Sequence, residues 1–199
     1  QMYLYADTTR SFYTDTRDTI GPDAELISAL GNHDIRPLEY FEKRNMELQP
    51  YVNPESLWGL DSIGCKYINY ADRPLHLWGG MYVHHGMSVS KHAGESVRND
   101  IDNFGVSLIR GHSHRQAIYH KTYQLRNETL TGIELGHFMD VNSSGASYDN
   151  VHNWQLGFGV GWVEDNPNAG TPDGKVFHVD LVRISPDYTA VVGGKLYKG

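Results

Sequence analysis

Leu26-Ile27-Ser28-Ala29-Leu30-Gly31-Asn32-His33-Asp34 is the stretch that decides the fold. A short apolar run of strand length ends at a glycine, and residues able to bind metal or move protons follow at once. Two later stretches repeat this arrangement: residues 77–83 lead into His84-His85-Gly86, and residues 106–109 lead into Gly111-His112-Ser113-His114. Because α/β sheets bind ligands just beyond the ends of their strands, we expect these three polar groups to form one site.

The residue types in the three groups indicate a metal site. Borderline divalent metals bind imidazole nitrogen together with carboxylate or amide oxygen. His112 and His114 are separated by a single residue, so both imidazoles can leave one loop in nearly the same direction. We expect Gly31 and Gly111, which precede their clusters, to free the backbone for a sharp turn.

Length and composition fit one domain, since 199 residues with 39% hydrophobic content suffice for one core. A formal charge of −7 disfavours a nucleic-acid coat held by basic patches, although bound metal ions could supply local positive charge in a nuclease. Cys65, the sole cysteine, excludes an intrachain disulfide and fits an intracellular or virion protein. With no secretion signal and no apolar run of membrane-spanning length, we expect no membrane partner.

The hydrophobic pattern predicts an α/β fold. Residues 1–23 carry no helical apolar repeat and predict an irregular lead-in closed by the Gly21-Pro22 turn. Pro50, Pro54 and Gly59 predict a break in regular structure. The expected helices cover residues 36–48 and 93–104, and the expected strands cover residues 26–30, 62–70, 75–83, 106–109, 118–119, 133–138, 158–163, 176–184 and 189–192.

The three motifs resemble those of the calcineurin-like metallophosphoesterases, whose signature runs Asp-x-His, Gly-Asp, Gly-Asn-His-Asp/Glu, His, and Gly-His-x-His. The last three blocks are present here, and the first two are not. Residues 153–160 and 191–197 look like the C-terminal part of phage-type members, so the resemblance covers about residues 24–199. It implies a single domain over residues 1–199, built as a two-sheet αββα sandwich that lacks its first strands.

The resemblance also implies a centre of two divalent ions, Mn²⁺, Zn²⁺ or iron. Asn32, His85 and His112 would bind one ion, and His114 would bind the other. Adjacent side chains at a strand end point to opposite faces, so only one of His84 and His85 can easily enter the site. The family pattern of His followed by Gly selects His85 and leaves His84 as a supporting or core residue.

His33 and Asp34 are the expected catalytic residues. In the family, the residue matching His33 protonates the leaving oxygen, and Asp34 would accept its other N–H and hold its orientation. A second interpretation of the same residues is helix capping, in which Asp34 accepts backbone N–H groups ahead of Pro37. The presence of the other two motifs favours catalysis.

Other residues carry weaker signals. Arg115, beside the last motif, is either a phosphate contact or a solvent-exposed arginine. His137 could approach the site from the strand-rich half, but a hydrogen-bonded buried histidine is the favoured interpretation. The aromatic residues Trp154, Phe158 and Trp162 are expected to pack between sheets rather than stack on bases. The remaining histidines, expected at the surface or in the core, are His76, His92, His120, His152 and His178.

The implied function is metal-dependent hydrolysis of a phosphoester, by a phosphodiesterase or nuclease acting in a host cell or virion. One ion lacks ligands, however, because His114 stands alone and no bridging carboxylate is present. The family supplies the missing groups from strands that would precede Gln1. We expect either a truncated or a split enzyme that needs an N-terminal complementing segment or chain. The alternative is a degenerate, non-catalytic relative that serves as a structural or binding protein.

Overall fold

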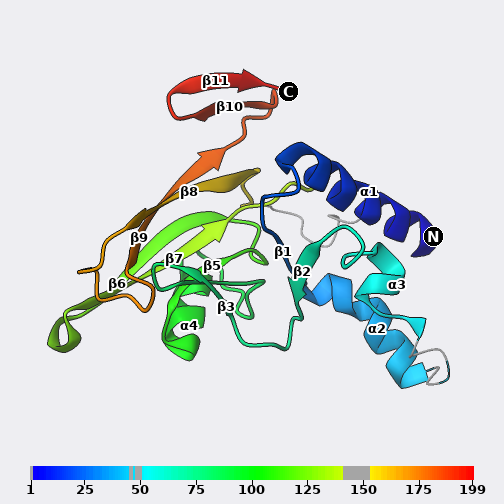
Figure 1. Cartoon of the computed structure of the whole chain (residues 1–199), viewed down its shortest axis with the longest axis horizontal. Helices are drawn as coiled ribbons and strands as arrows, with labels where there is room; N and C mark the ends of the chain where they lie inside the picture. Colours follow the sequence, from blue (N-terminus) through cyan, green and yellow to red (C-terminus); the bar gives the residue numbers. More distant parts are fainter. Residues whose placement is uncertain (1, 45–46, 48–50, 141–152) are drawn as a thin grey trace. The chain divides into compact units, whose positions relative to one another are not determined.

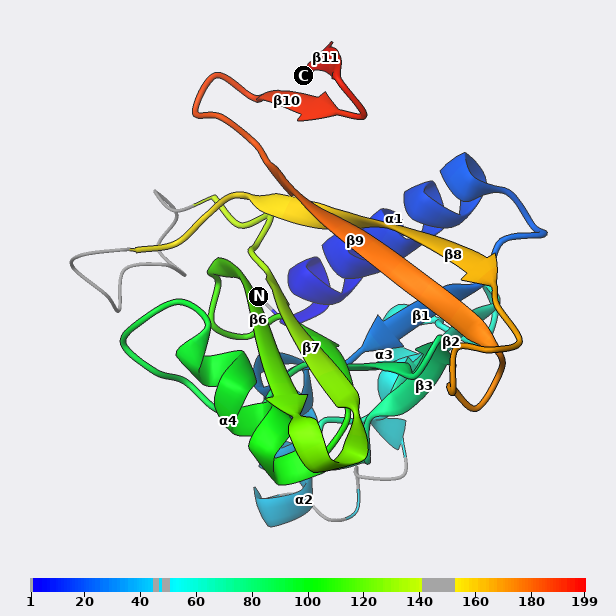
Figure 2. The ribbon, with the colours of Figure 1, turned by 90° about the vertical axis from the view of Figure 1, so that its left-hand side faces the viewer.

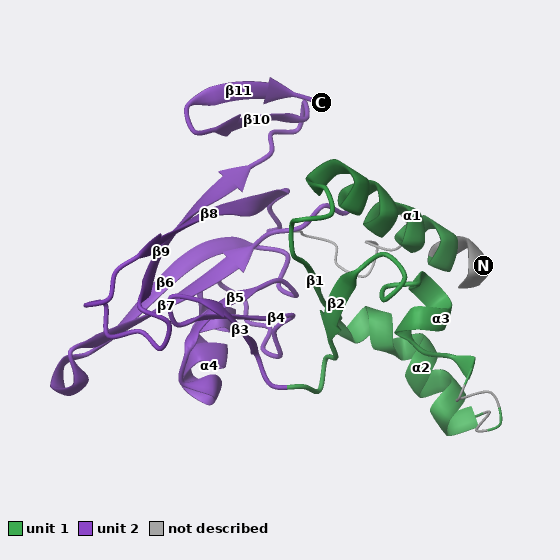
Figure 3. Cartoon of the chain, in the orientation of Figure 1, with its two compact units in different colours: residues 1–72 green, residues 73–199 purple. Residues whose placement is uncertain are grey.

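The computed structural model describes residues 2–44, 47, 51–140 and 153–199 and has a mixed α/β fold with several sheets. The chain forms two compact units, residues 1–72 and 73–199 (Figure 3). Unit 1 contains α1 Met2–Ile20, β1 Leu26–Ala29, α2 Asn32–Arg44, α3 Pro54–Trp58 and β2 Cys65–Ile68 (Figure 1). Unit 2 contains β3 Leu75–Trp78, β4 Met81–His84, α4 Glu95–Phe104, β5 Ser107–Arg110, β6 Gln116–Tyr123, β7 Glu128–Leu135, β8 Gly157–Asp165, β9 Lys175–Arg183, β10 Thr189–Val192 and β11 Lys195–Lys198.

Helix α1 replaces the irregular lead-in that we expected over residues 1–23. Cationic side chains make part of its contact with the rest of unit 1, so no full apolar repeat is visible in the sequence. Ala6 and Tyr13 pack on the core of unit 1, and the guanidinium of Arg10 lies against Gly59. Arg17 donates from its guanidinium to the carbonyl oxygens of Ile63 (3.0 Å), Gly21 (3.0 Å) and Ala24 (2.7 Å). Tertiary contacts therefore stabilise a helix that propensity alone does not predict.

The rest of unit 1 surrounds a small core of Leu30, Trp58, Leu60 and Cys65. Strands β1 and β2 pair in parallel, and α2 starts at Asn32, not at residue 36 as we expected. Positions 45, 46 and 48 of the expected helix lie outside the described residues. Helix α3 occupies the predicted break, because Asn53 and Ser56 cap each other and Pro54 sits at the first helical turn.

Unit 2 is built in three layers around a five-stranded sheet of order β3-β4-β5-β7-β6. Helix α4 covers one face with Val97 and Ile101, while the β8–β9 ribbon covers the other with Val179 (Figure 1). Strands β4, β5 and β7 are parallel, whereas β3 and β6 run antiparallel at the two edges. Figure 2 shows the β6–β7 and β8–β9 pairs side by side. The parallel pairing of β4 with β5 places the ends of these two strands next to each other.

Most predicted strands of unit 2 are present, with shifted ends. The strand expected over residues 75–83 is instead the β3–β4 hairpin, because Gly79 and Gly80, with φ of 58° and 74°, form its turn. Helix α4 ends at Phe104, as predicted. Strand β11 was not predicted; it pairs with β10 and is exposed along its length. Within the described ranges, every helix is too short or too polar to cross a bilayer.

Candidate metal centre

Two of the three polar groups meet at the ends of β4 and β5. These strands are parallel neighbours in which His84 is paired with Arg110, so the loops that follow leave the same edge of the sheet. The backbone N–H of Gly111 donates to the carbonyl oxygen of His85 over 3.1 Å, which ties the loops together. The predicted placement at strand ends is confirmed for this pair of motifs.

His85 and His112 face each other at this edge. Nε2 of His85 lies 3.1 Å from Nδ1 of His112. Two imidazole nitrogens bound to one ion at about 2.1 Å, with a ligand–metal–ligand angle of about 90–110°, would be about 3.0–3.4 Å apart. The observed separation therefore fits a pair of ligands for one ion, and equally fits a hydrogen bond between one protonated and one unprotonated nitrogen.

The surroundings of His85 keep its imidazole neutral. Burial, followed by the nearby His112 and Arg110, lowers the pKa of His85 from 6.5 to about 3. A neutral imidazole is the form that binds a metal ion, because the imidazolium has no free lone pair. The protein thus keeps this nitrogen available at neutral pH.

This shift predicts loss of stability in acid. Because the folded-state pKa of His85 lies below its unfolded value, the unfolded chain binds more protons between pH 6.5 and 3. Stability should be greatest above pH 6.5 and fall toward pH 3, with this residue contributing at most about 1.4 kcal/mol per pH unit. Denaturant melts of the wild type and His85→Gln from pH 7 to pH 4 measure this, and parallel pH profiles would contradict it.

The Gly-His-x-His loop has an unusual backbone. His112 and His114 have φ of 63° and 59°, in the left-handed region that non-glycine residues rarely adopt. Gly31 and Gly111 do not have positive φ, so the sharp turn that we assigned to them is made elsewhere: His112 and His114 adopt it themselves, and Gly86, with φ of 100°, adopts it after His85. Such strain persists only where the surroundings hold it.

A buried ion pair holds the loop after His85. Arg110 Nη1 and Asp100 Oδ2 are 2.8 Å apart, and both side chains are 0% exposed. The carboxylate of Asp100 also accepts the backbone N–H groups of Met87 (3.1 Å) and Ser88 (3.0 Å). The guanidinium of Arg110 in turn donates to the carbonyl oxygens of Ser88 (2.7 Å) and Gly111 (3.2 Å). One pair therefore anchors both histidine loops.

Glu134 of β7 provides a second anchor. Its buried carboxylate accepts the hydroxyl of Ser113 (3.0 Å) and the backbone N–H of Gly94 (2.9 Å). Ser113 is thereby fixed between the two strained histidines. Neither Glu134 nor the Arg110–Asp100 pair was singled out from the sequence. The available signal was a polar residue within each apolar pattern, at the end of β5, within α4 and within β7.

His84 and Arg115 have supporting roles in the described structure. His84 is 1% exposed, its ring lies 5.4 Å from that of Phe104 on α4, and its Nδ1 accepts the N–H of Gly86 at 3.0 Å. It is a core residue, which is one of the two roles that the resemblance left for it. Arg115 donates to the carbonyl oxygens of Ser90 and Asn153, so it braces the loops rather than extending into solvent.

His114 lies beside residues from the strand-rich half of unit 2. Its ring centroid is 4.6 Å from that of Trp154 and 5.8 Å from that of His137. His137 therefore lies beside the histidine loops, and it is also half-buried and hydrogen-bonded, since its Nδ1 accepts the N–H of Met139 at 3.0 Å. Trp154 is not core packing between sheets, and Trp162 is 45% exposed. His152 lies outside the described residues.

In unit 1, Asp34 is a helix cap. Its Oδ2 accepts the backbone N–H of Gly31 at 2.7 Å, three residues back, as in a capping box. Within the described residues it accepts no N–H from His33, so the predicted orienting bond is absent and the capping interpretation is confirmed. Burial is the largest influence on Asp34 and raises its carboxyl pKa.

His33 instead faces a cation. Its Nδ1 lies 3.2 Å from Nη1 of Arg36, which can only donate, so the neutral ring carries its proton on Nε2. Burial first, and then Arg36, lower the pKa of His33, while Asp34 raises it. A general-acid role for His33 therefore needs an anionic substrate that restores the imidazolium.

Asn32 presents the clearest open ligand atom of unit 1. Its Oδ1 is buried and has no hydrogen-bond partner among the described residues. An orphaned buried carbonyl oxygen is costly, and a metal ion or an ordered water would satisfy it. Across the described ranges, however, no group of three or more His, Cys, Asp or Glu residues is arranged to hold a metal ion. The features that fit a metal are thus the His85–His112 pair and, within its own unit, Asn32.

No family model matches the chain. Two curated relatives are both called Gene 54 protein: that of Mycobacterium phage D29 is 28% identical over 171 residues, and that of Mycobacterium phage L5 is 26% identical over 171 residues. Each match covers 83% of this chain and 61% of the relative, so the chain spans about three-fifths of the length of the curated relatives it matches. These similarities support a phage origin and name no activity.

Proposed function

We propose that this chain is the C-terminal part of a metal-dependent phosphoester hydrolase of the calcineurin-like metallophosphoesterase type, acting as a phosphodiesterase or nuclease. The observation that carries the proposal is the 3.1 Å approach of His85 Nε2 to His112 Nδ1 at adjoining ends of parallel strands. The buried Arg110–Asp100 ion pair supports the proposal, because it anchors both loops and so orients the two histidines as ligands. The three-layered unit 2 would be part of an αββα sandwich.

Each motif has a role in this proposal. His85 and His112 bind one divalent ion, and Asn32 and His114 are further ligands assigned by the motifs. The ions, when bound, neutralise phosphate charge and activate water for attack on phosphorus. His33 gives a proton to the leaving oxygen. Asp34 fixes the helix turn that carries His33, through its bond to the Gly31 N–H.

Metal titration tests the ligand set. Calorimetric titration of Mn²⁺ or Zn²⁺ should show binding to the chain that weakens at least about tenfold in His112→Gly. Glycine adopts the φ of 63° at this position without strain, so the change removes the imidazole and preserves the loop. His120→Ala, at an exposed histidine of β6, is the matched control. Equal affinities of the wild type and His112→Gly would remove the metal-site interpretation.

A non-catalytic relative is the second candidate. The capping role of Asp34, together with the absence of a three-residue metal group from the described ranges, favours it. Such a protein would be a virion or scaffold component that keeps the fold without the chemistry. The hydrolase proposal instead implies a phosphoester substrate, which includes nucleic acid, an N-terminal complementing segment or chain, and action in the host cytoplasm or the virion.

A further inference from the structure

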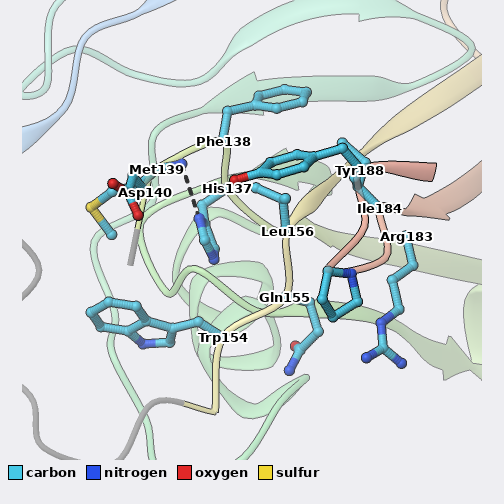
Figure 4. A pocket seen from close by; sticks show the side chains of 11 residues that line it. His137, Phe138, Met139, Asp140, Trp154, Gln155, Leu156, Arg183, Ile184 and Tyr188 are labelled. Carbon is cyan, nitrogen blue, oxygen red and sulfur yellow. Dashed lines mark hydrogen bonds between the residues drawn. The ribbon is translucent and has the colours of Figure 1, made fainter. Parts of the chain in front are cut away.

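A cavity of about 350 Å³ opens next to His114. Its lining includes Trp154 and His137, the two rings that lie 4.6 Å and 5.8 Å from the His114 ring. Phe138, Tyr188 and Arg183 also line the cavity (Figure 4). The volume is that of a small-molecule site. If a phosphate is bound at His114, the group that the phosphate carries would lie beside this cavity.

The lining has the chemistry of a site for a flat, polar ring. Aromatic side chains reach it from three separate segments, at Phe138, Trp154 and Tyr188. Arg183 adds a cation that forms no ion pair or hydrogen bond with any other residue in the described part of the chain. Aromatic faces stack on nucleobases of any sequence, and a guanidinium can bind a base carbonyl or a phosphate.

The floor of the cavity is tightly connected. Backbone N–H groups of Gln155, His137 and Gly157 donate to the carbonyl oxygens of His114 (2.9 Å), Gln155 (3.1 Å) and His137 (3.0 Å), respectively. Ile184 N–H donates to Leu156 O at 2.8 Å, which joins the end of β9 to this floor. A Cβ on Gly157 would lie 2.3 Å from a backbone oxygen, so the chain segments approach as closely as glycine allows. The wall is therefore rigid enough to keep a shape.

Tyr188 is held in a strained conformation at the rim. Its φ is 59°, although the residue is 67% exposed and gains little from burial. The turn that starts at Ser185 fixes it, since Tyr188 N–H donates to Ser185 O at 2.9 Å. A bulky residue at positive φ is a conformational outlier of the kind that clusters at binding sites.

We propose that this cavity, the Trp154–Tyr188 pocket, binds the nucleobase of a nucleoside phosphodiester whose phosphate lies at His114. The inference rests on the proposed function for the phosphate and adds the substrate class. It assigns the phosphodiesters of nucleosides, whether free nucleotides or units of a single strand, in preference to phosphoproteins or aliphatic phosphoesters.

Binding of adenosine 5′-monophosphate and ribose 5-phosphate to the chain, each with Mn²⁺ present, tests this directly. The two probes share the phosphate and differ by the base. We expect the nucleotide to bind at least about tenfold more tightly, and we expect Tyr188→Gly and Trp154→Ala each to weaken it by about 5- to 100-fold without affecting ribose 5-phosphate. Displacement of the nucleotide by a single-stranded octanucleotide would identify a strand as the source, and failure to displace it would identify a free nucleotide.

The variants are chosen so that misfolding cannot imitate the result. Glycine is comfortable at the φ of 59° of Tyr188, so Tyr188→Gly should melt no lower than the wild type. Trp162→Ala removes an exposed aromatic ring of β8 outside the pocket and should leave nucleotide affinity unchanged.

Equal affinity for the two probes, no nucleotide binding at millimolar concentration, or unchanged affinity in both pocket variants would each overturn the assignment. These results are distinguishable from failure of the proposed hydrolase. Equal binding of the two probes, together with hydrolysis of bis-p-nitrophenyl phosphate by the chain joined to an upstream segment that carries Asp-x-His and Gly-Asp, would contradict the pocket alone. Base-dependent nucleotide binding without hydrolysis by that longer protein would contradict the hydrolase alone.

Discussion

Asp100→Ala is expected to lower the free energy of unfolding by about 3–5 kcal/mol, because it leaves the guanidinium of Arg110 buried without its partner. Both side chains of the pair are 0% exposed, so water cannot replace the lost carboxylate. The backbone N–H groups of Met87 and Ser88 lose their acceptor as well. Urea or guanidinium melts measure the loss, and a change below about 1 kcal/mol would contradict a structural role for this pair.

A double replacement separates stability from positioning. Asp100→Leu combined with Arg110→Met removes both charges and should restore much of the stability, since apolar residues often replace a buried pair at little cost. The loops of His85 and Gly111 would still lose the bonds that anchor them. We therefore expect the double variant to be folded but to bind Mn²⁺ about 10–100-fold more weakly. Wild-type metal affinity in a stable double variant would show that the pair does not position the ligands.

His33→Asn is expected to lower the rate of phosphodiester hydrolysis by about 10²–10⁴-fold on substrates with poor leaving groups, in a protein complete enough to be active. The loss should be much smaller when the leaving group is p-nitrophenol, which departs without a proton. Metal content should stay unchanged. If the variant loses its metal, His33 is a ligand and the assigned role is wrong.

Arg36→Gln tests the role of His33 in a second way. Arg36 lowers the pKa of His33 in the free protein, so its removal should raise that pKa and keep the acid form populated to higher pH. The alkaline limb of the kcat/KM profile should move to higher pH in Arg36→Gln and be absent in His33→Asn. An unmoved limb would assign it to another group.

Local pattern predicted the parts of the fold in which local preference and packing agree. Helix α4 and strands β1, β5 and β10 follow directly from apolar periodicity and glycine stops. Helix α1 was missed because polar contacts help to hold it: the half-buried guanidinium of Arg17 donates to the carbonyl oxygens of Ile63 and Ala24, where an apolar side chain would have given a visible pattern. The β3–β4 hairpin was missed although Gly79-Gly80 is a recognised turn signal.

In the candidate site, too, some features could be predicted from the sequence and others could not. Alternation along β4 predicted that only one of His84 and His85 enters the site, and the resemblance selected His85; in the structure His84 is buried and His85 faces His112. The strained backbone of His112 and His114 could not be inferred, because the contacts around it include the bond between Ser113 and Glu134, which are distant in sequence. The contacts of Trp154 with His114 and His137 are equally non-local. Sequence periodicity places side chains on faces, but it does not reveal which distant segments meet there.

Hydrolysis of bis-p-nitrophenyl phosphate in the presence of Mn²⁺ tests the central claim most directly. It should be compared between this chain and a longer protein that joins it to an upstream segment carrying Asp-x-His and Gly-Asp. We expect near silence from the chain itself, because the motifs leave one ion with His114 alone and without a bridging carboxylate, and we expect hydrolysis from the longer protein that is lost in His112→Gly. Silence in both, with the longer protein folded and loaded with Mn²⁺, would contradict the hydrolase and favour the non-catalytic relative.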